Sequence, residues 1–150
     1  MTNSPFKYVN FIQSKYFPLE NFKCPCEKCK NKEFTWEYLD PKLIQKLDAL
    51  KELTSYNLVI TSGYRCEEHN TQIGGEWKSA HTRGQAVDLT IQPYTDFSAL
   101  RYLFMLAEQV KFHGIGIYPH KRIIHCDVSN RFQRWRQNRQ GVYIYLFVDE

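Results

Sequence analysis

The segment HTRGQAVDLTI, residues 81–91, holds the pattern on which the fold of this chain depends. Its first part places His81 and Asp88 seven residues apart, with a glycine between them, and its second part has the apolar and β-branched composition of a strand. A second strand-like segment, IIHCD at residues 123–127, carries His125. If the two strands are neighbours in a sheet, the two histidines and the aspartate converge on one site.

Alternation along the second segment predicts which side chains share a face with His125. Side chains two apart on a strand point the same way, so Asp127 is expected on the side of His125 and Cys126 on the opposite side. We therefore interpret Cys126 as a small core residue and not as a nucleophile paired with a histidine. Cys66 is interpreted in the same way, as a small core residue.

The rest of the chain mixes helices and strands without a regular strand-helix-strand repeat. Asp40 followed by Pro41 predicts a helix that runs to about residue 53, because aspartate caps helices and proline suits the first helical position. The strongest helical pattern covers residues 96–110. Further elements are expected as a short helix at 66–73 and strands at 57–61, 84–91, 115–118, 122–128 and 142–148. This order predicts an α+β fold, a small antiparallel sheet with flanking helices.

Length and composition fit a single domain. The chain has 150 residues, of which 43% are hydrophobic and 24% charged, so it can close a core, and global disorder is excluded. We expect an arm at residues 1–39 that wraps the core, a catalytic core at 40–135 and a C-terminal strand within 136–150. A monomer is expected.

The net charge and the hydropathy of the chain limit the classes of partner that we expect. The formal net charge of +4 is a mild excess that does not demand nucleic acid. No apolar run reaches the roughly 18 to 20 residues of a membrane helix, so membrane insertion is not expected. The opening MTNSPFKYVN lacks the apolar stretch of a signal peptide, which predicts that the chain is cytoplasmic when synthesised.

Two imidazoles and one carboxylate are a suitable ligand set for Zn²⁺. Three protein ligands leave a fourth coordination position for water, which is typical of catalytic zinc sites. Such an ion polarises a carbonyl and lowers the pKa of bound water, so hydrolysis is the chemistry that we expect. The alternative from spacing alone is that His81 is a surface loop residue and that Asp88 caps a turn.

Several short motifs follow one another in a fixed order along the chain. They are SGYR at 62–65, EHN at 68–70, GG at 74–75, S-x-H-x-x-G-x-A-x-D at 79–88, GIGIYP at 114–119 and HCD at 125–127. Together they resemble the zinc D-Ala-D-Ala carboxypeptidase family, whereas any one of them alone is a weak signal. That family includes peptidoglycan-cleaving endopeptidases and phage endolysins. It is similar in fold to vancomycin-resistance dipeptidases and to the hedgehog signalling domain.

The resemblance implies roles for five residues. His81, Asp88 and His125 match the zinc ligands. Arg65 matches an arginine that binds substrate and helps to polarise the scissile carbonyl, a role that suits the fixed donors of a guanidinium. Its alternative is a strand-end arginine in a surface ion pair. Ser79 matches a serine that lies near the substrate, and its alternative is a hydroxyl that caps the loop.

The general base is where this sequence departs from the family. Several relatives have an acidic residue three positions before the last histidine ligand, but here that position is Arg122, which cannot accept a proton. Asp127 is the first candidate, either as the base or as an anchor for a ligand histidine, and His120 is the second. The alternative for Asp127 is a carboxylate that caps a backbone N–H or pairs with an arginine.

The run CPCEKC supplies three closely spaced thiols, Cys24, Cys26 and Cys29. Thiolates bind zinc well, so these residues raise the alternative of a second, structural zinc ion. Such a site needs a fourth ligand, which the spacing does not reveal. We therefore expect reduced thiols in a loop.

The basic run RFQRWRQNRQ, residues 131–140, places four arginines around Trp135. Read alone, it suggests contacts with a nucleic-acid backbone and stacking on bases. The resemblance instead implies a segment that closes the domain after the HCD strand, with a charge that suits the anionic cell wall. Nucleic acid is therefore not expected as a partner.

Together these observations predict a zinc-dependent metallopeptidase that hydrolyses an amide bond in the peptide part of peptidoglycan. A phage-type lysis or cell-wall-remodelling enzyme is expected, acting after membrane permeabilisation. The alternative is a binding module that keeps the metal fold without turnover, which the arginine at position 122 favours. The bond that is cut, D-Ala-D-Ala or another, does not follow from the sequence.

Overall fold

The computed structural model describes residues 12–93 and 96–146. They form an α+β fold around a six-stranded sheet with the strand order β1-β2-β4-β3-β5-β6. Neighbouring strands are antiparallel except β3 and β5, which run parallel. The strands are β1 Asn57–Ser62, β2 Ala86–Gln92, β3 Gly114–Tyr118, β4 Ile123–Asp127, β5 Gln133–Gln137 and β6 Tyr143–Leu146.

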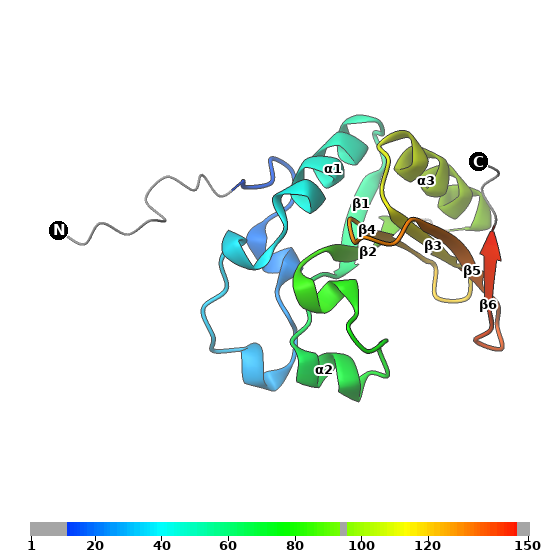
Figure 1. Ribbon diagram of the computed structural model, residues 1–150. Helices are drawn as coiled ribbons and strands as arrows, with labels where there is room; N and C mark the ends of the chain where they lie inside the picture. The colour runs from blue at the N-terminus through cyan, green and yellow to red at the C-terminus, as the bar shows by residue number, and fades with distance from the viewer. Residues whose placement is uncertain (1–11, 94–95, 147–150) are drawn as a thin grey trace.

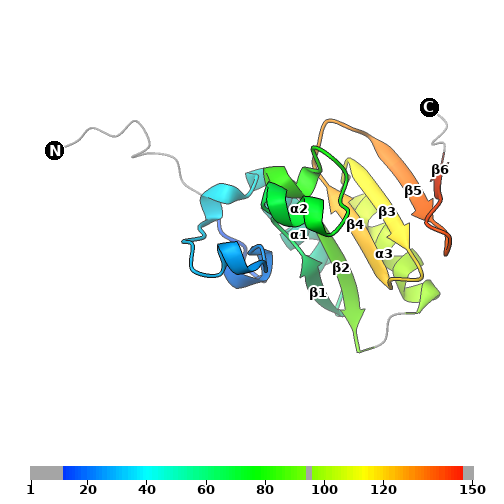
Figure 2. The same ribbon diagram turned by 90° about the horizontal axis from the view of Figure 1, so that it is seen from below.

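The helices lie on the two faces of the sheet. α1 (Pro41–Glu52) and α3 (Phe97–Gln109) lie on one face, and the short α2 (Glu67–Gln72) lies beyond the other (Figure 1). Figure 2 looks onto the face that α1 and α3 leave open, where α2 stands in front of the strands. The described chain also has the short 3-10 helices η1 Leu19–Phe22, η2 Glu27–Cys29, η3 Trp36–Tyr38 and η4 Ala80–Arg83.

The hydrophobic core lies between the sheet and the pair α1 and α3. Leu47 of α1 and Leu103 of α3 are fully buried there, together with Val87, Ile124 and Cys126 from the central strands. Because side chains alternate along a strand, the neighbours of these strand residues point to the open face. The sheet therefore has one apolar face for stability and one face for polar side chains.

Most elements predicted from the sequence are present. The helix that begins after Asp40 forms, and its cap is confirmed because Asp40 Oδ1 accepts a hydrogen bond from the N–H of Lys42 at 2.9 Å. Phe17, Phe22 and Leu39, which lie in the arm, are buried in the core.

Two features of the sheet differ from the prediction. Strand β5 falls in the basic run, which we had not assigned as a strand because polar residues dominate it and Trp135 is its one large apolar side chain. Its pairing with β3 is parallel, so the sheet is not wholly antiparallel. Residues 147 and 148 of the last predicted strand, and Phe6, Tyr8 and Phe11 of the arm, lie outside the described residues. Within the described residues, no helix has the length and apolar character needed to cross a membrane.

Candidate metal centre and active-site cleft

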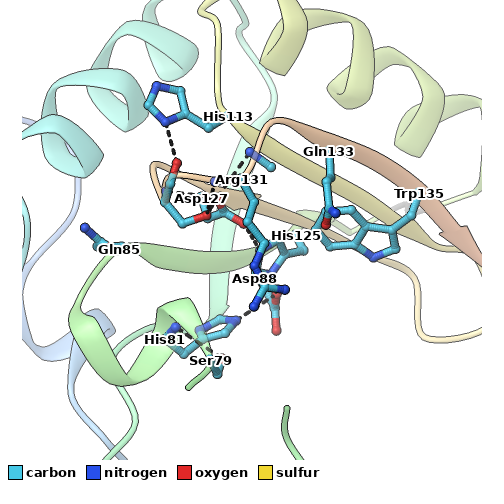
Figure 3. Close-up of polar contacts among 12 residues, drawn as sticks. Ser79, His81, Gln85, Asp88, His113, His125, Asp127, Arg131, Gln133 and Trp135 are labelled. Carbon is cyan, nitrogen blue, oxygen red and sulfur yellow. Dashed lines mark hydrogen bonds and ion pairs between the residues drawn. The ribbon is translucent and has the colours of Figure 1, made fainter. Parts of the chain in front are cut away.

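Two adjacent strands and one short helix bring the predicted ligands together on the open face of the sheet. Asp88 of β2 stands directly opposite His125 of β4 in the antiparallel register, which places their side chains next to each other. His81 belongs to η4, which immediately precedes β2. Figure 3 shows His81 and His125 approaching Asp88 from two sides.

The hydrogen bonds of the two histidines leave one ring nitrogen of each directed at Asp88. His81 Nδ1 lies 2.8 Å from the carbonyl oxygen of Gly63, so this nitrogen donates and Nε2 is left without a proton. His125 Nε2 lies 2.7 Å from Asp127 Oδ2, so in the neutral ring Nδ1 is the bare nitrogen. These two nitrogens lie 3.4 Å and 3.2 Å from Asp88 Oδ1.

This donor set fits a zinc ion. Zinc binds nitrogen and oxygen at about 2.0–2.1 Å in a tetrahedron, which sets its ligand atoms about 3.3 Å apart. One ligand atom each of His81, Asp88 and His125 lies within 4.8 Å of the others, and the three side chains are nearly buried. With both rings neutral, as metal binding requires, the arrangement provides two nitrogens, one carboxylate oxygen and no fourth ligand from this group.

The charges of these groups stabilise one another. Burial raises the pKa of Asp88, but the two imidazoles beside it outweigh that effect and hold the pKa well below its usual range. Burial lowers the pKa of His125, but hydrogen bonds to Asp127 and Asp88 raise it to about 9. Negative charge on the aspartates is therefore favoured at neutral pH, as a cation site requires.

Asp127 is held by four hydrogen bonds. Its Oδ1 accepts from the N–H of Gly114 at 3.2 Å, from the N–H of Ser129 at 3.0 Å and from Ser129 Oγ at 2.8 Å. Its Oδ2 faces His125 Nε2. Burial raises the pKa of Asp127, but these hydrogen bonds and the charge of His125 lower it overall. Of the roles predicted for Asp127, the contacts are those of an anchor that orients His125.

Arg65 follows the end of β1 and points into the same site. Its Nε donates to Ser62 Oγ at 3.0 Å, its Nη1 to Asn70 Oδ1 at 3.1 Å and its Nη2 to Asp88 Oδ2 at 3.3 Å. A guanidinium carries five N–H groups, so two remain for a further acceptor. Arg65 thus forms a nearly buried ion pair with Asp88, not a surface one, and lines the cleft, while its role in substrate binding stays a prediction.

The metal centre opens into a cleft of about 490 Å³. Its lining runs from Gly74 and Glu76, in the loop after α2, across the central strands to Tyr143 and Tyr145 of β6. Ser79 also lines it, and its Oγ accepts from the N–H of His81 at 3.3 Å, so this hydroxyl caps η4 at the edge of the cleft.

Strand β5 adds an aromatic wall that the sequence analysis did not assign to the site. The ring of Trp135 lies 5.2 Å from the ring of His125, and its Nε1 donates to the Tyr118 hydroxyl at 2.9 Å. Two glycines of β3 make this packing possible. A Cβ on Gly116 would come within 2.3 Å of the Trp135 ring, and one on Gly114 would collide with the Asp127 carboxylate. In the sequence, the two glycines of the GIG motif at residues 114–116 were the only local sign that neighbouring side chains pack against this strand.

The other candidates for the general base are placed differently. His120 lies in the turn between β3 and β4, outside the residues that line the cleft. Arg122 lies in the same turn with a backbone φ of 57°, and it does not line the cleft either. Glu76 does line the cleft, and its Oε1 accepts from Arg131 Nη1 at 3.1 Å. Sequence reasoning missed Glu76.

Three of the four arginines of the basic run make contacts with other side chains of the protein. Arg134 pairs with Glu108 at 2.7 Å and also donates to the carbonyl oxygens of Phe112 and His113. Arg136 lies over the ring of Phe97 at 5.6 Å. Arg131 pairs with Glu76 across the cleft edge, as described above. Much of the positive charge of this run therefore secures β5 and the cleft.

The thiols of the arm have a neighbour that the sequence analysis placed elsewhere. Cys66, which we expected in the core, is only half-buried and lies beside Cys24, Cys26 and Cys29. The prediction for Cys66 is therefore wrong, because the residue follows β1 at the point where the arm crosses the loop. Cys126 is fully buried in the core, as predicted.

Comparison with known proteins finds a family and several relatives that this chain resembles in sequence. The protein-family model described as Peptidase M15 matches residues 15–127. A stretch of 98 residues is 32% identical to the peptidoglycan L,D-endopeptidase MepK of Escherichia coli strain K12, covering 61% of this chain and 52% of that protein. The same identity and coverage hold for the proteins of that name from Escherichia coli O157:H7 and Shigella flexneri. The chain thus spans about half the length of these curated relatives.

Proposed function

The chain belongs to the peptidase M15 family, and from that membership we propose that it is a zinc-dependent peptidase that hydrolyses an amide bond in the peptide part of peptidoglycan. One observation carries the proposal. At the cleft, bare nitrogens of His81 and His125 and an oxygen of Asp88 stand about as far apart as ligands around one zinc ion.

Each residue of the site has a proposed task. His81, Asp88 and His125 would hold Zn²⁺, which when bound supplies a Lewis acid for the scissile carbonyl and favours deprotonation of water. The two free N–H groups of Arg65 bind the carbonyl oxygen as it gains negative charge. Asp127 orients His125 through the hydrogen bond to Nε2.

Proton transfer then falls to another group. Asp127 already uses both of its oxygens in hydrogen bonds and has a lowered pKa, so we propose that it does not accept the proton from water. Glu76, whose side chain is 70% exposed at the cleft edge, and His120 are the two groups to compare. Replacing each separately, as Glu76→Gln and His120→Ala, identifies the acceptor by the larger fall in kcat at unchanged zinc content.

We propose internal cleavage of the peptide rather than removal of a C-terminal residue. The relatives are described as L,D-endopeptidases. The cleft lining continues on both sides of the metal centre, from the loop after α2 to β6, so a chain can extend past the reacting bond in both directions. Five of its lining residues are Lys or Arg and three are Asp or Glu, a balance that suits peptides with free carboxylates.

Purified peptidoglycan is the substrate for the test. Incubation with the full chain should release fragments that carry new amine termini, and mass analysis of the fragments identifies the bond. A chelator should stop the release, and added Zn²⁺ should restore it. A protein that binds the wall without forming new amine termini under either condition would overturn the proposal in favour of the binding module.

The biological setting that we propose is phage-type lysis or wall remodelling. The support for it is the motif resemblance, which extends to phage endolysins. The added protein should clear a suspension of permeabilised cells, and the same cells should stay turbid with the His81→Ala variant. Release of fragments from purified wall without clearing would contradict a role in lysis while leaving the peptidase activity intact.

A further inference from the structure

Four of the five cysteines meet at one point beside the loop that carries Arg65. Three of them come from the arm, and Cys66 follows Arg65 and forms the cap of α2. We call Cys24, Cys26, Cys29 and Cys66 the cysteine cluster. Their Sγ atoms all lie within 4.8 Å of one another. Cys66 Sγ lies 3.8 Å from Cys24 Sγ and 3.6 Å from Cys26 Sγ.

These separations match ligands around one ion and not a disulfide. A disulfide brings two sulfurs to about 2.05 Å, and all four cysteines of the cluster are free. Sulfurs bound to zinc at about 2.3 Å in a tetrahedron lie about 3.8 Å apart. The Sγ–Sγ separations of Cys66 from Cys24 and from Cys26 agree with that value to about 0.2 Å.

A backbone donor points at one sulfur of the cluster. The N–H of His69 donates to Cys66 Sγ at 3.4 Å. Hydrogen bonds of this kind stabilise thiolates more than thiols, because the acceptor carries the charge. This backbone donor thus favours a negative sulfur at Cys66.

Positive side chains border the cluster as well. Lys23 and Lys32 line the small cavity formed beside Cys24, Cys29 and Cys66. Four thiolates around a divalent cation carry two negative charges in excess, which nearby ammonium groups offset. Glu33 and the aromatic residues Phe34, Tyr38 and Tyr64 complete the lining, so two lysines and one glutamate border the cluster on this side.

We propose that the cysteine cluster is a structural zinc site, separate from the centre formed by the two histidines and Asp88. Four thiolates form a closed tetrahedral shell with no position left for substrate, which is the character of structural zinc. Sulfur ligands also disfavour Mg²⁺, Ca²⁺ and Mn²⁺. The missing fourth ligand of the CPCEKC run is therefore Cys66, 37 residues beyond Cys29.

The ion would hold the arm against the loop that orients the active site. The N–H of Tyr64 donates to the carbonyl oxygen of Phe22 at 2.8 Å, so the arm and the loop already touch beside the cluster. In the same loop, the Gly63 carbonyl oxygen accepts from His81 and Arg65 reaches Asp88. Zinc at the cluster is thus a positioning device for the catalytic centre.

Metal counting on the intact chain tests the proposal. Elemental analysis of the zinc-replete protein should find two zinc ions per chain. Both Cys26→Ser and Cys66→Ser should retain one, as should His81→Ala, and the combination of His81→Ala with Cys26→Ser should retain none. Cys126→Ala is the matched control, because this fifth cysteine lies in the core, and it should retain two.

Cobalt provides a measurement that does not depend on how the cysteine variants fold. With Co²⁺ in place of zinc, His81→Ala should keep an intense sulfur-to-cobalt charge-transfer band, because its cysteine cluster is intact. Absence of that band, a single zinc that disappears in His81→Ala, or iron in place of zinc would each overturn the proposal. None of these outcomes bears on release of peptidoglycan fragments, so failure here is distinguishable from failure of the proposed peptidase.

Discussion

The two ring nitrogens of His125 face different carboxylates. The different roles that we propose for Asp88 and Asp127 follow from this arrangement. Nδ1 faces Asp88 at 3.2 Å, and Nε2 faces Asp127 at 2.7 Å. A carboxylate that accepts from one nitrogen of an imidazole fixes the tautomer and increases the basicity of the other nitrogen. We therefore expect Asp127 to act on the proposed zinc site through His125 without touching the ion.

The first residue-scale prediction concerns Asp127→Asn. An amide cannot accept from His125 and also accept the three donors on the other oxygen, so the ring loses its orientation. Zinc affinity at the active centre should fall by about 10- to 100-fold, as with other outer carboxylates of metal-bound histidines. Competition with a chromophoric chelator measures it. Unchanged zinc affinity with a large loss of kcat would make Asp127 the general base instead.

The second residue-scale prediction concerns His81→Ala. The variant should lose one zinc ion per chain and at least about three orders of magnitude in kcat/KM, because a bound metal contributes several kcal/mol to catalysis of this kind. His69→Ala is the matched control, since His69 belongs to α2 and does not line the cleft. Normal zinc content with full activity in His81→Ala would remove this residue from the ligand set.

At the scale of elements, β3 shapes the site because two of its positions have no side chain. Two of its five residues are glycines on the open face, and the space they leave is filled by side chains of neighbouring strands. The Trp135 ring lies over Gly116, and the Asp127 carboxylate lies over Gly114. A strand with ordinary side chains at these positions would push both away from His125.

Gly116→Ala tests this packing. The added Cβ would lie 2.3 Å from the Trp135 ring, so the ring must move and its hydrogen bond to Tyr118 is lost. We expect the free energy of unfolding to fall by about 1–3 kcal/mol, the usual cost of overpacking, with lower kcat/KM and a shifted indole N–H resonance. Ile117→Val, on the opposite face of β3, should cost about 0.5–1.5 kcal/mol and leave that resonance in place. An unshifted resonance in Gly116→Ala would contradict this account.

At the scale of the whole molecule, the sheet separates stability from chemistry. The face toward α1 and α3 carries the buried apolar side chains, and the opposite face carries the ligands and the cleft. Alternation along β2 and β4 makes this division, because each core residue has a neighbour that points to the open face. Mutations on the apolar face should therefore lower stability, whereas mutations on the open face should lower activity.

Leu47→Ala tests the division. Leu47 is completely buried in the core beneath the sheet, and its truncation should lower the free energy of unfolding by about 2–5 kcal/mol in urea denaturation. The kcat/KM per folded molecule should stay close to that of the unmodified chain when measured well below the unfolding temperature. A collapse of activity in fully folded Leu47→Ala would mean that the two faces are coupled.

Local patterns in the sequence predicted most of the elements, although not β5, and they placed the three candidate ligands on strands and a turn. The shared face of His125 and Asp127 follows from the two-residue period of a strand, which is a property of the backbone within a few residues. The cap at Asp40 and the helix after it are local in the same sense. The order of the motifs, through the family resemblance, also predicted that His81 and Asp88 lie beside His125.

Other features required contacts between distant segments. The parallel pairing of β5 with β3 brings Trp135 to His125, and the crossing of the arm over the loop after β1 brings Cys66 to Cys26. Neither contact follows from local periodicity, because many alternative closures of the chain have similar entropy and only the packing of the complete core selects one of them. The candidate ligands could therefore be proposed from the sequence, whereas the neighbours that orient them appear only in the folded molecule.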